Sequence, residues 1–176
     1  MRRFRVGWRL AFVVAVTPIV YVAVQYPVRL WETIATANIV RDLGFRGVPM
    51  VLQTSILLVP YHHGAFWVTL TPSCSALAPA LAITCLASMM PRATARRFLA
   101  VGGAVVAVVV GNFLRICSSV VVGLYAGRSS LVLFHDWVGS MIGFAFTLGG
   151  FVLMLWILLP AHASTPIPSV VAEGAE

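Results

Sequence analysis

The stretch that decides the fold is FLAVGGAVVAVVVGNFLRICSSVVVGLY, residues 98–125. Its only charged side chain is Arg115, and most of the other side chains are small or aliphatic. A helix rises about 1.5 Å per residue, so about 20 apolar residues cross a hydrocarbon core of about 30 Å. The stretch is long and apolar enough to predict a transmembrane helix.

The composition of the whole chain agrees with a membrane protein. Of its 176 residues, 60% are hydrophobic and 10% are charged, whereas soluble domains have about 25% charged residues. Three more apolar stretches, at residues 8–26, 75–90 and 135–159, have the length of membrane spans or nearly so. The sequence therefore predicts an all-α membrane protein with four transmembrane helices in one domain, residues 1–160.

The basic residues predict the orientation of the chain. All 12 are arginines; four, Arg2, Arg3, Arg5 and Arg9, lie before or at the start of the first span, and three, Arg92, Arg96 and Arg97, lie between the second and third. The positive-inside rule places both regions in the cytoplasm, so residues 27–74 and 126–134 are expected outside the cytoplasmic membrane. The net charge of +7 is thus a topology signal, and no nucleic-acid partner is predicted, because the charges flank spans and form no stripe.

The amino-terminal stretch has a second interpretation, because a basic start followed by an apolar run is also typical of a signal peptide. The small residues ATA at 35–37 would then mark the cleavage region. Arg29 and Glu32 separate that region from the apolar run by more than the usual distance. We therefore expect a retained membrane anchor with its amino terminus inside.

The segment between the first two spans predicts two further elements. Residues 28–45 place apolar side chains on a roughly helical period, which indicates an amphipathic helix on the outer surface that ends near Gly44. Two β-rich runs, 50–59 and 65–71, flank PYHHG and predict a β-hairpin. An open hairpin cannot lie in lipid, so it should cover the outer ends of the spans. Residues 161–176 are expected to form a disordered cytoplasmic tail.

Polar side chains within the spans are candidates for function, because charges there cost several kcal/mol. Asn112 and Arg115 lie on one helix face, and Arg115 falls near the outer surface. Arg115 alone could extend to the lipid headgroups, but an Asn112 that faces the bundle can hold a neighbouring side chain. His135 and Asp136 open the fourth span, where a first-turn acidic residue is also ordinary.

Cys74, in TPSCSALAP at residues 71–79, stands at the outer start of the second span. Cys74, Arg115 and His135 thus come from different helices and meet one membrane face. A nearby cation can activate a thiol, Arg115 can donate to an oxyanion, and His135 can move protons. These three residue types predict acyl transfer through a thioester.

The other chemically interesting residues have simpler interpretations. Cys85 and Cys117 are expected to be apolar fillers, and Gly139 and Gly143 an ordinary helix-packing face. His62 and His63 are expected to be exposed. No CxxC or HExxH spacing occurs, so no metal site and no cofactor are predicted.

In this order and topology, the chain resembles the exosortase and archaeosortase family of membrane cysteine transpeptidases. The pieces that match are PSCSA at 72–76, NFLR at 112–115 and FHDWVG at 134–139. The likeness covers about residues 45–159, and the chain looks like a reduced member with four spans. Ala76 stands where the family usually has Gly.

The resemblance implies a membrane-embedded cysteine protease or transpeptidase with catalytic residues Cys74, Arg115 and His135, supported by Asn112 and Asp136. Its partners would be secreted proteins that end in a short motif, a transmembrane helix and a basic cluster. Cys74 would attack the scissile carbonyl outside the membrane, and the acyl group would pass to water or to an acceptor such as a lipid amine. Either Arg115 or His135 fits the role of proton carrier.

A noncatalytic alternative also fits the polar residues of the third span. A membrane scaffold or small transporter would use Asn112 and Arg115 to line a polar pathway. Such a protein has no need of a thiol facing His135, so the position of Cys74 discriminates between the two functions.

Overall fold

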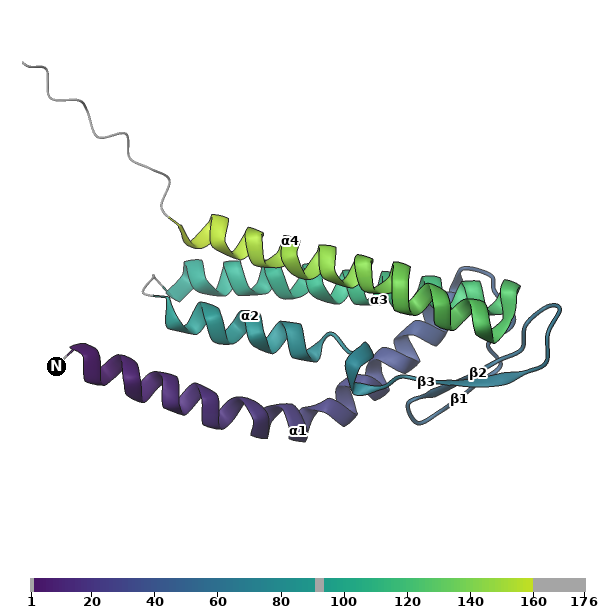
Figure 1. Ribbon diagram of the computed structural model, residues 1–176, viewed down its shortest axis with the longest axis horizontal. Helices are drawn as coiled ribbons and strands as arrows, with labels where there is room; N and C mark the ends of the chain where they lie inside the picture. Colours follow the sequence, from purple (N-terminus) through teal and green to yellow (C-terminus); the bar gives the residue numbers. More distant parts are fainter. Residues whose placement is uncertain (1, 91–93, 160–176) are drawn as a thin grey trace, which may run out of the picture.

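The computed structural model describes the backbone of residues 2–90 and 94–159 and the side chains of residues 14–90 and 95–159. The helices run roughly lengthwise, and a small sheet lies at one end (Figure 1). In chain order the elements are α1 (Arg2–Asp42), β1 (Met50–Leu52), β2 (Ser55–Leu58), β3 (Phe66–Thr69), η1 (Pro72–Cys74), α2 (Leu77–Met89), α3 (Thr94–Phe134), η2 (His135–Gly139) and α4 (Ser140–Leu158). The predicted tail at 161–176 lies outside the described residues.

The prediction of a separate amphipathic helix at 28–45 is wrong, because α1 is one continuous helix of 41 residues that contains Pro18 and Pro27. Proline is tolerated inside membrane helices, where neighbouring groups satisfy the freed backbone carbonyls. The predicted end near Gly44 is confirmed. Gly44 has φ +91° and its N–H donates to the carbonyl of Arg41, so the chain leaves the helix through a left-handed residue.

The predicted hairpin is a three-stranded antiparallel sheet in the order β1-β2-β3. The run at 50–59 is divided by a tight turn, in which Gln53 has φ +53°. The β2–β3 pair forms the predicted hairpin, and its register places Leu57 opposite Trp67 and Leu58 opposite Phe66. The intervening loop lies on α3, because the N–H of Tyr61 donates to the carbonyl of Leu124. His62 and His63 are exposed as predicted.

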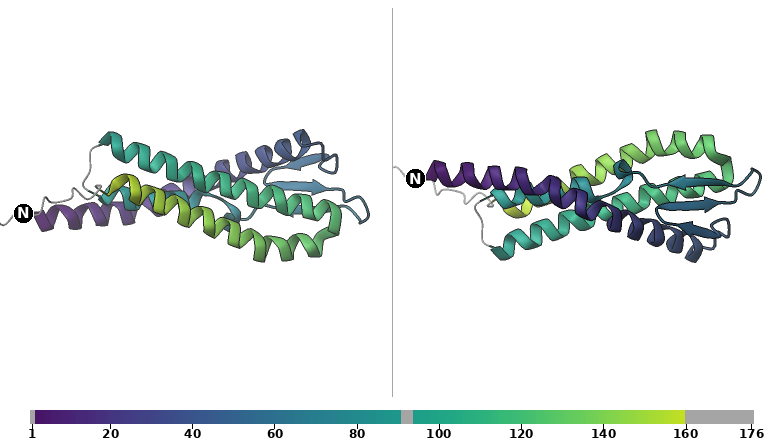
Figure 2. Two further views of the ribbon diagram at one scale, coloured as in Figure 1. Left: turned by 90° about the horizontal axis from the view of Figure 1, so that it is seen from above. Right: turned by 90° about the horizontal axis from the view of Figure 1, so that it is seen from below.

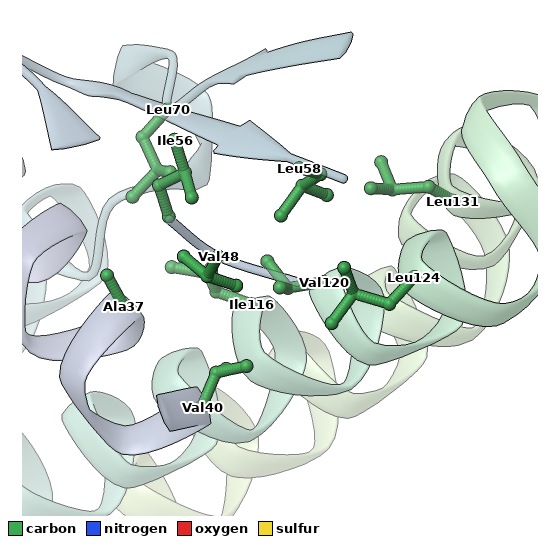
Figure 3. Close-up of a cluster of buried hydrophobic side chains, with 10 residues drawn as sticks. All are labelled: Ala37, Val40, Val48, Ile56, Leu58, Leu70, Ile116, Val120, Leu124 and Leu131. Carbon is green, nitrogen blue, oxygen red and sulfur yellow. The ribbon is translucent and has the colours of Figure 1, made fainter. Parts of the chain in front are cut away.

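One face of the sheet packs against the helices and forms the first of two hydrophobic clusters (Figure 3). Buried side chains from α1, the sheet and α3 point into it: Ala37, Val40, Val48, Ile56, Leu58, Leu70, Ile116, Val120, Leu124 and Leu131. The burial of strand residues alternates, so Phe66 and Val68 pack inward while Trp67 and Thr69 face outward. This cluster fixes β3, and the segment after it, relative to α3.

The helices α3 and α4 form an antiparallel hairpin (Figure 2). The reversal occurs at Gly127, whose φ of +78° interrupts the helical backbone of α3. Close packing along the pair depends on small residues: a methyl group at Gly111 would overlap Phe146, and one at Gly150 would lie 2.9 Å from the carbonyl oxygen of Ala104. A second cluster of buried side chains joins α2, α3 and α4 near the opposite end of the molecule.

Two described segments, Val14–Asp42 and Ala95–Leu158, are long and apolar enough to cross a membrane. The second contains both legs of the α3–α4 hairpin. The predicted second span corresponds to α2, a shorter apolar helix of 13 residues, which at about 1.5 Å per residue is about 20 Å long. The chain is thus mostly helical with a small sheet, and the division into four spans stays a prediction.

Candidate active site

Cys74, Arg115 and His135 lie together at the sheet end of the helices. Cys74 is the last residue of η1, Arg115 lies in the middle of α3, and His135 begins the π-helical turn η2. His135 Nε2 is 3.3 Å from Cys74 Sγ and 3.1 Å from Arg115 Nη2. One imidazole nitrogen therefore contacts both of the other predicted site residues.

Ser119 determines which nitrogen of His135 carries the proton. The Ser119 hydroxyl donates to the carbonyl of Arg115 at 2.7 Å, so its oxygen is left as an acceptor. That oxygen lies 3.2 Å from His135 Nδ1. We assign the neutral tautomer with hydrogen on Nδ1, because only an Nδ1–H can donate to this oxygen. Nε2 then presents its lone pair to the Cys74 thiol and to the Arg115 guanidinium.

Thr71 completes the surroundings of the thiol. Its hydroxyl oxygen is 3.2 Å from Cys74 Sγ and 2.8 Å from the hydroxyl of Ser73. Burial raises the pKa of Cys74, but the hydrogen bonds with His135 and Thr71 and the charge of His135 together lower it by more. The pKa falls from its ordinary value of 9.0 to about 6. The lowered pKa favours transfer of the thiol proton to His135 Nε2, which gives a thiolate beside an imidazolium whose Nδ1–H still donates to Ser119.

The stem of Arg115 passes over the small face that Gly139 and Gly143 form. A methyl group at Gly139 would lie 3.0 Å from Arg115 Cγ, and one at Gly143 would lie 3.7 Å from its Cδ. The glycine pair thus makes room for the arginine that contacts His135, which goes beyond the ordinary helix packing that the sequence predicts. Arg115 Nε is buried and has no hydrogen-bond partner among the described residues.

The backbone N–H groups that follow Cys74 are occupied. The N–H of Cys74 donates to Thr71, that of Ser75 to Pro72, that of Ala76 to Glu32, and that of Leu77 to the Ser75 hydroxyl. They offer no free backbone donor for an oxyanion beside the thiol. Arg115 has unused N–H groups close to His135, so it is the donor that remains.

Asn112 binds Glu32, a residue that the sequence analysis did not place in the site. Its amide nitrogen donates to Glu32 Oε1 at 3.1 Å, and the same oxygen accepts the Ala76 N–H at 2.9 Å. Glu32 is 2% exposed and Asn112 is 8% exposed. Glu32 therefore joins α1 to α3 and to the start of α2, two residues after Cys74, and it holds the segment that carries Cys74 in place.

A comparison with known families decides where this site belongs. The family model for the transmembrane exosortase, Exosortase_EpsH, matches residues 1–159. The chain belongs to the transmembrane exosortase family. Exosortases are membrane cysteine transpeptidases that act on secreted proteins with sorting signals, so the location of this chain is a membrane. No curated protein and no solved structure matches it.

Within this exosortase-family chain, the predicted residues are not equally close to the thiol. Asp136 is exposed and lines a cavity of about 350 Å³ beside Cys74, whereas the hydrogen-bond partners of the thiol among the described residues are His135 and Thr71. Ser119 and Thr71, which the prediction did not include, both touch a central side chain. The only sequence signal for Ser119 was its place one turn beyond Arg115, and for Thr71 a hydroxyl three residues before the thiol.

Ala76, at the position where the resemblance to the family implied glycine, has φ −68° and ψ −10° and is 5% exposed. This is an ordinary helical conformation, so the backbone here needs no glycine. The alanine methyl group packs in the second hydrophobic cluster. The other two thiols have different surroundings: Cys85 lies 3.1 Å from the Thr17 hydroxyl, and Cys117 packs against the first cluster.

Proposed function

We propose that the chain is a membrane-embedded cysteine transpeptidase that cleaves the carboxy-terminal sorting signal of secreted proteins through a thioester. The observation that carries the proposal is the contact of His135 Nε2 with both Cys74 Sγ and Arg115 Nη2. The catalytic residues are Cys74, Arg115 and His135, with Asn112 and Asp136 in supporting positions.

In the first step His135 is the proton carrier. Nε2 accepts the proton of the Cys74 thiol, and the thiolate attacks the scissile carbonyl, so that a carbon–sulfur bond forms and the carbonyl oxygen becomes an anion. Once Nε2 is protonated it no longer accepts from Arg115. The released N–H groups of Arg115 then donate to the oxyanion. This division of roles follows from the tautomer that Ser119 sets.

In the second step the tetrahedral intermediate collapses. The carbon–nitrogen bond breaks, the leaving amine takes the proton from Nε2, and the sorting-signal helix departs with a new amino terminus. The acyl group remains on Cys74 as a thioester. An amine acceptor, such as the headgroup of an aminolipid, or water then attacks the thioester and gives its proton to Nε2, and the Cys74 thiolate leaves.

The site also supports a topology. We place the sheet end on the extracytoplasmic face of the cytoplasmic membrane and the amino terminus inside, with α1, α2, α3 and α4 as four spans. The open edges of the three-stranded sheet support this placement, because unpaired strand edges are not tolerated in lipid. Substrate proteins anchored by a carboxy-terminal helix with a basic cluster would then bring their scissile bond to Cys74 at the membrane surface.

The scaffold or transporter alternative has less support. The Asn112 amide binds the buried Glu32, and Arg115 binds His135, so each of these polar groups is engaged within the bundle. Neither contact needs a permeating solute. The lowered pKa of Cys74, to about 6, has no role in a scaffold.

The experiment is co-expression of this chain with secreted proteins that end in a transmembrane helix and a cluster of Lys or Arg. We expect the substrate to lose its carboxy-terminal helix when wild-type enzyme is present. The variants Cys74→Ala and His135→Ala should leave the substrate uncleaved. Cys85→Ala is the matched control, since it removes a thiol remote from His135 and should process normally.

The thioester gives a second, direct readout. Mass spectrometry of the intact enzyme should show a substrate-derived acyl group on Cys74 that hydroxylamine removes. Processing that continues unchanged in Cys74→Ala would refute the proposal. An acyl group found on Cys85 or Cys117 would refute the assignment of the nucleophile.

A further inference from the structure

The cavity beside Cys74 is a groove with a free strand edge along one side. The sheet order β1-β2-β3 leaves β3 paired on one side only. Six consecutive residues, 66–71, line the cavity, and Cys74 stands at the end of this run. Because successive strand residues face opposite sides of a sheet, six lining residues in a row mean that the backbone edge itself borders the cavity.

The hydrogen-bond pattern identifies the backbone groups on this edge. The N–H of Leu70 donates to the carbonyl of Thr54, so the backbone of Leu70 is directed toward the β2 side. The direction alternates along an antiparallel strand, and the N–H and C=O groups of Trp67 and Thr69 therefore point into the groove. The 2.8 Å contact between the Ser55 and Thr69 hydroxyls agrees, because close side chains mark a non-hydrogen-bonded pair.

One face of a helix forms the opposite wall. Its lining residues are Arg128, Leu131, Val132, His135 and Asp136, a spacing that corresponds to one side of a helix. Figure 2 shows β3 as the strand nearest to this part of the α3–α4 hairpin. From residue 128 to residue 135 the helix rises about 10 Å, which is close to the length of about 13 Å of the four-residue β3. Ile116 and Val120, both apolar, also line the cavity.

We propose that an extended segment of the substrate adds to β3 as a fourth strand, and that this pairing delivers the scissile carbonyl to Cys74. The inference rests on the proposed function. The occupant is a peptide because the groove offers a row of unpaired backbone donors and acceptors that ends at the nucleophile. The added strand runs parallel to β3, since β3 and the acyl part of the substrate both run toward Cys74.

Strand addition predicts that a longer peptide labels Cys74 faster, and that only every second backbone amide of the peptide is needed for this gain. The probe is a tetrapeptide chloromethyl ketone of alternating alanine and valine, with the single-valine chloromethyl ketone for comparison. Its thioether forms when the Cys74 thiolate displaces chloride. We expect the tetrapeptide to label Cys74 at least about tenfold faster, because several backbone hydrogen bonds form. Two probes that are N-methylated at adjacent inner amides should differ by about tenfold, since only one amide faces β3.

A matched pair of enzyme variants tests the edge itself. Both Thr69→Pro and Thr69→Ala remove the hydroxyl that contacts Ser55, but only proline removes the N–H and places its ring in the groove. Proline is accepted on an edge strand when its nitrogen faces away from the pairing partner. We expect Thr69→Pro to label with the tetrapeptide at least about tenfold more slowly than Thr69→Ala. Labelling by iodoacetamide, which needs no strand, should be equal in the two variants.

The outcomes separate this inference from the proposed function. Strand addition is refuted if the tetrapeptide and the single-valine probe label Cys74 at the same rate. It is also refuted if the two N-methylated probes label Cys74 at the same rate. A groove that accepts a lipid chain would give this result. The N-methylated probes use the wild-type enzyme, so the test holds even if a Thr69 variant does not fold. If processing depends on Cys74 but the two N-methylated probes react alike, the proposed function stands and only strand addition is refuted. If processing does not depend on Cys74, the proposed function is refuted whatever the probes show.

Discussion

His135 should control the protonation of Cys74, and its replacement should move the pH profile of the thiol. The hydrogen bond and the charge of His135 are among the causes that hold the Cys74 pKa at about 6 instead of 9.0, while burial acts in the opposite direction. In His135→Ala only burial and Thr71 remain. We therefore expect the pKa of Cys74 to rise to about 9.

The expected change in the labelling rate of Cys74 depends on the nucleophilicity of the thiolate as well as on the fraction of thiolate. Near pH 7, a thiol of pKa about 6 is about nine-tenths thiolate, and one of pKa about 9 is about one-hundredth thiolate, which is about a 90-fold difference. A thiolate of lower pKa attacks more weakly, by about 20-fold here for a Brønsted slope of about 0.45. The two effects nearly cancel, and labelling near pH 7 should fall by only about fourfold.

The midpoint of the pH profile is therefore the decisive measurement. Iodoacetamide labelling is followed from about pH 5 to about pH 10 in a background of Cys85→Ala and Cys117→Ala, so that only Cys74 reacts. The parent should show a midpoint at about 6 and His135→Ala a midpoint at about 9. A midpoint that stays at about 6 in His135→Ala would refute the Cys74–His135 pairing.

Three other replacements test the supports of the site. Ser119→Ala should reduce substrate processing by about tenfold, because the Nδ1–H of His135 loses its acceptor. Ser118→Ala, a matched change on the adjacent residue, should have little effect, and equal losses in the two variants would contradict the tautomer assignment. Glu32→Ala leaves the Ala76 N–H and the Asn112 amide without their acceptor. It should lower the free energy of unfolding, measured in detergent, by about 2 to 4 kcal/mol, and Glu32→Gln should lower it by less. Gly111→Ala adds a methyl group that overlaps the ring of Phe146 in α4 and should lower the free energy of unfolding by about 1 to 3 kcal/mol. Gly102→Ala, which has open space around it, should not lower it. Equal free energies of unfolding in the two variants would contradict the helix packing.

The sequence predicted Cys74, Arg115 and His135 as the central residues because polar residues are rare within membrane spans. Asn112, Arg115 and His135 were conspicuous in apolar surroundings, and the span order placed them at one face with Cys74. Glu32 was hidden, because it lies in a segment with several charges, and its two donors are 44 and 80 residues away along the chain. No local pattern encodes such contacts.

The errors in the predicted fold have similar causes. The change from an apolar run at 8–26 to an amphipathic pattern at 28–45 suggested two helices, but α1 continues through Pro27, which membrane helices tolerate. The turn that divides the run at 50–59 uses Gln53 with φ +53°, a conformation usually marked by Gly or Asn. The sequence carried no such residue there, so two strands were predicted as one.

Ala76 tests whether glycine, which the resemblance to the family implied at this position, would have a local role in this chain. Glycine at position 76 keeps the N–H that donates to Glu32 and removes only a buried methyl group. Loss of that methyl group costs about 0.8 kcal/mol, and the added backbone freedom costs about 0.5 to 1 kcal/mol. Ala78→Gly, at an exposed position in α2, carries only the second cost.

We therefore expect Ala76→Gly to lower the free energy of unfolding by about 1.5 kcal/mol, about twice the effect of Ala78→Gly. The rate of Cys74 labelling should stay unchanged in both variants, because Ala76 contacts the thiol through neither its side chain nor its N–H. A large change in labelling by Ala76→Gly alone would show that the backbone beside the nucleophile must move beyond the helical φ and ψ that alanine holds. If Ala76→Gly and Ala78→Gly label at the same rate, the residue at position 76 affects the packing of α2, and His135 and Thr71 determine the reactivity of Cys74.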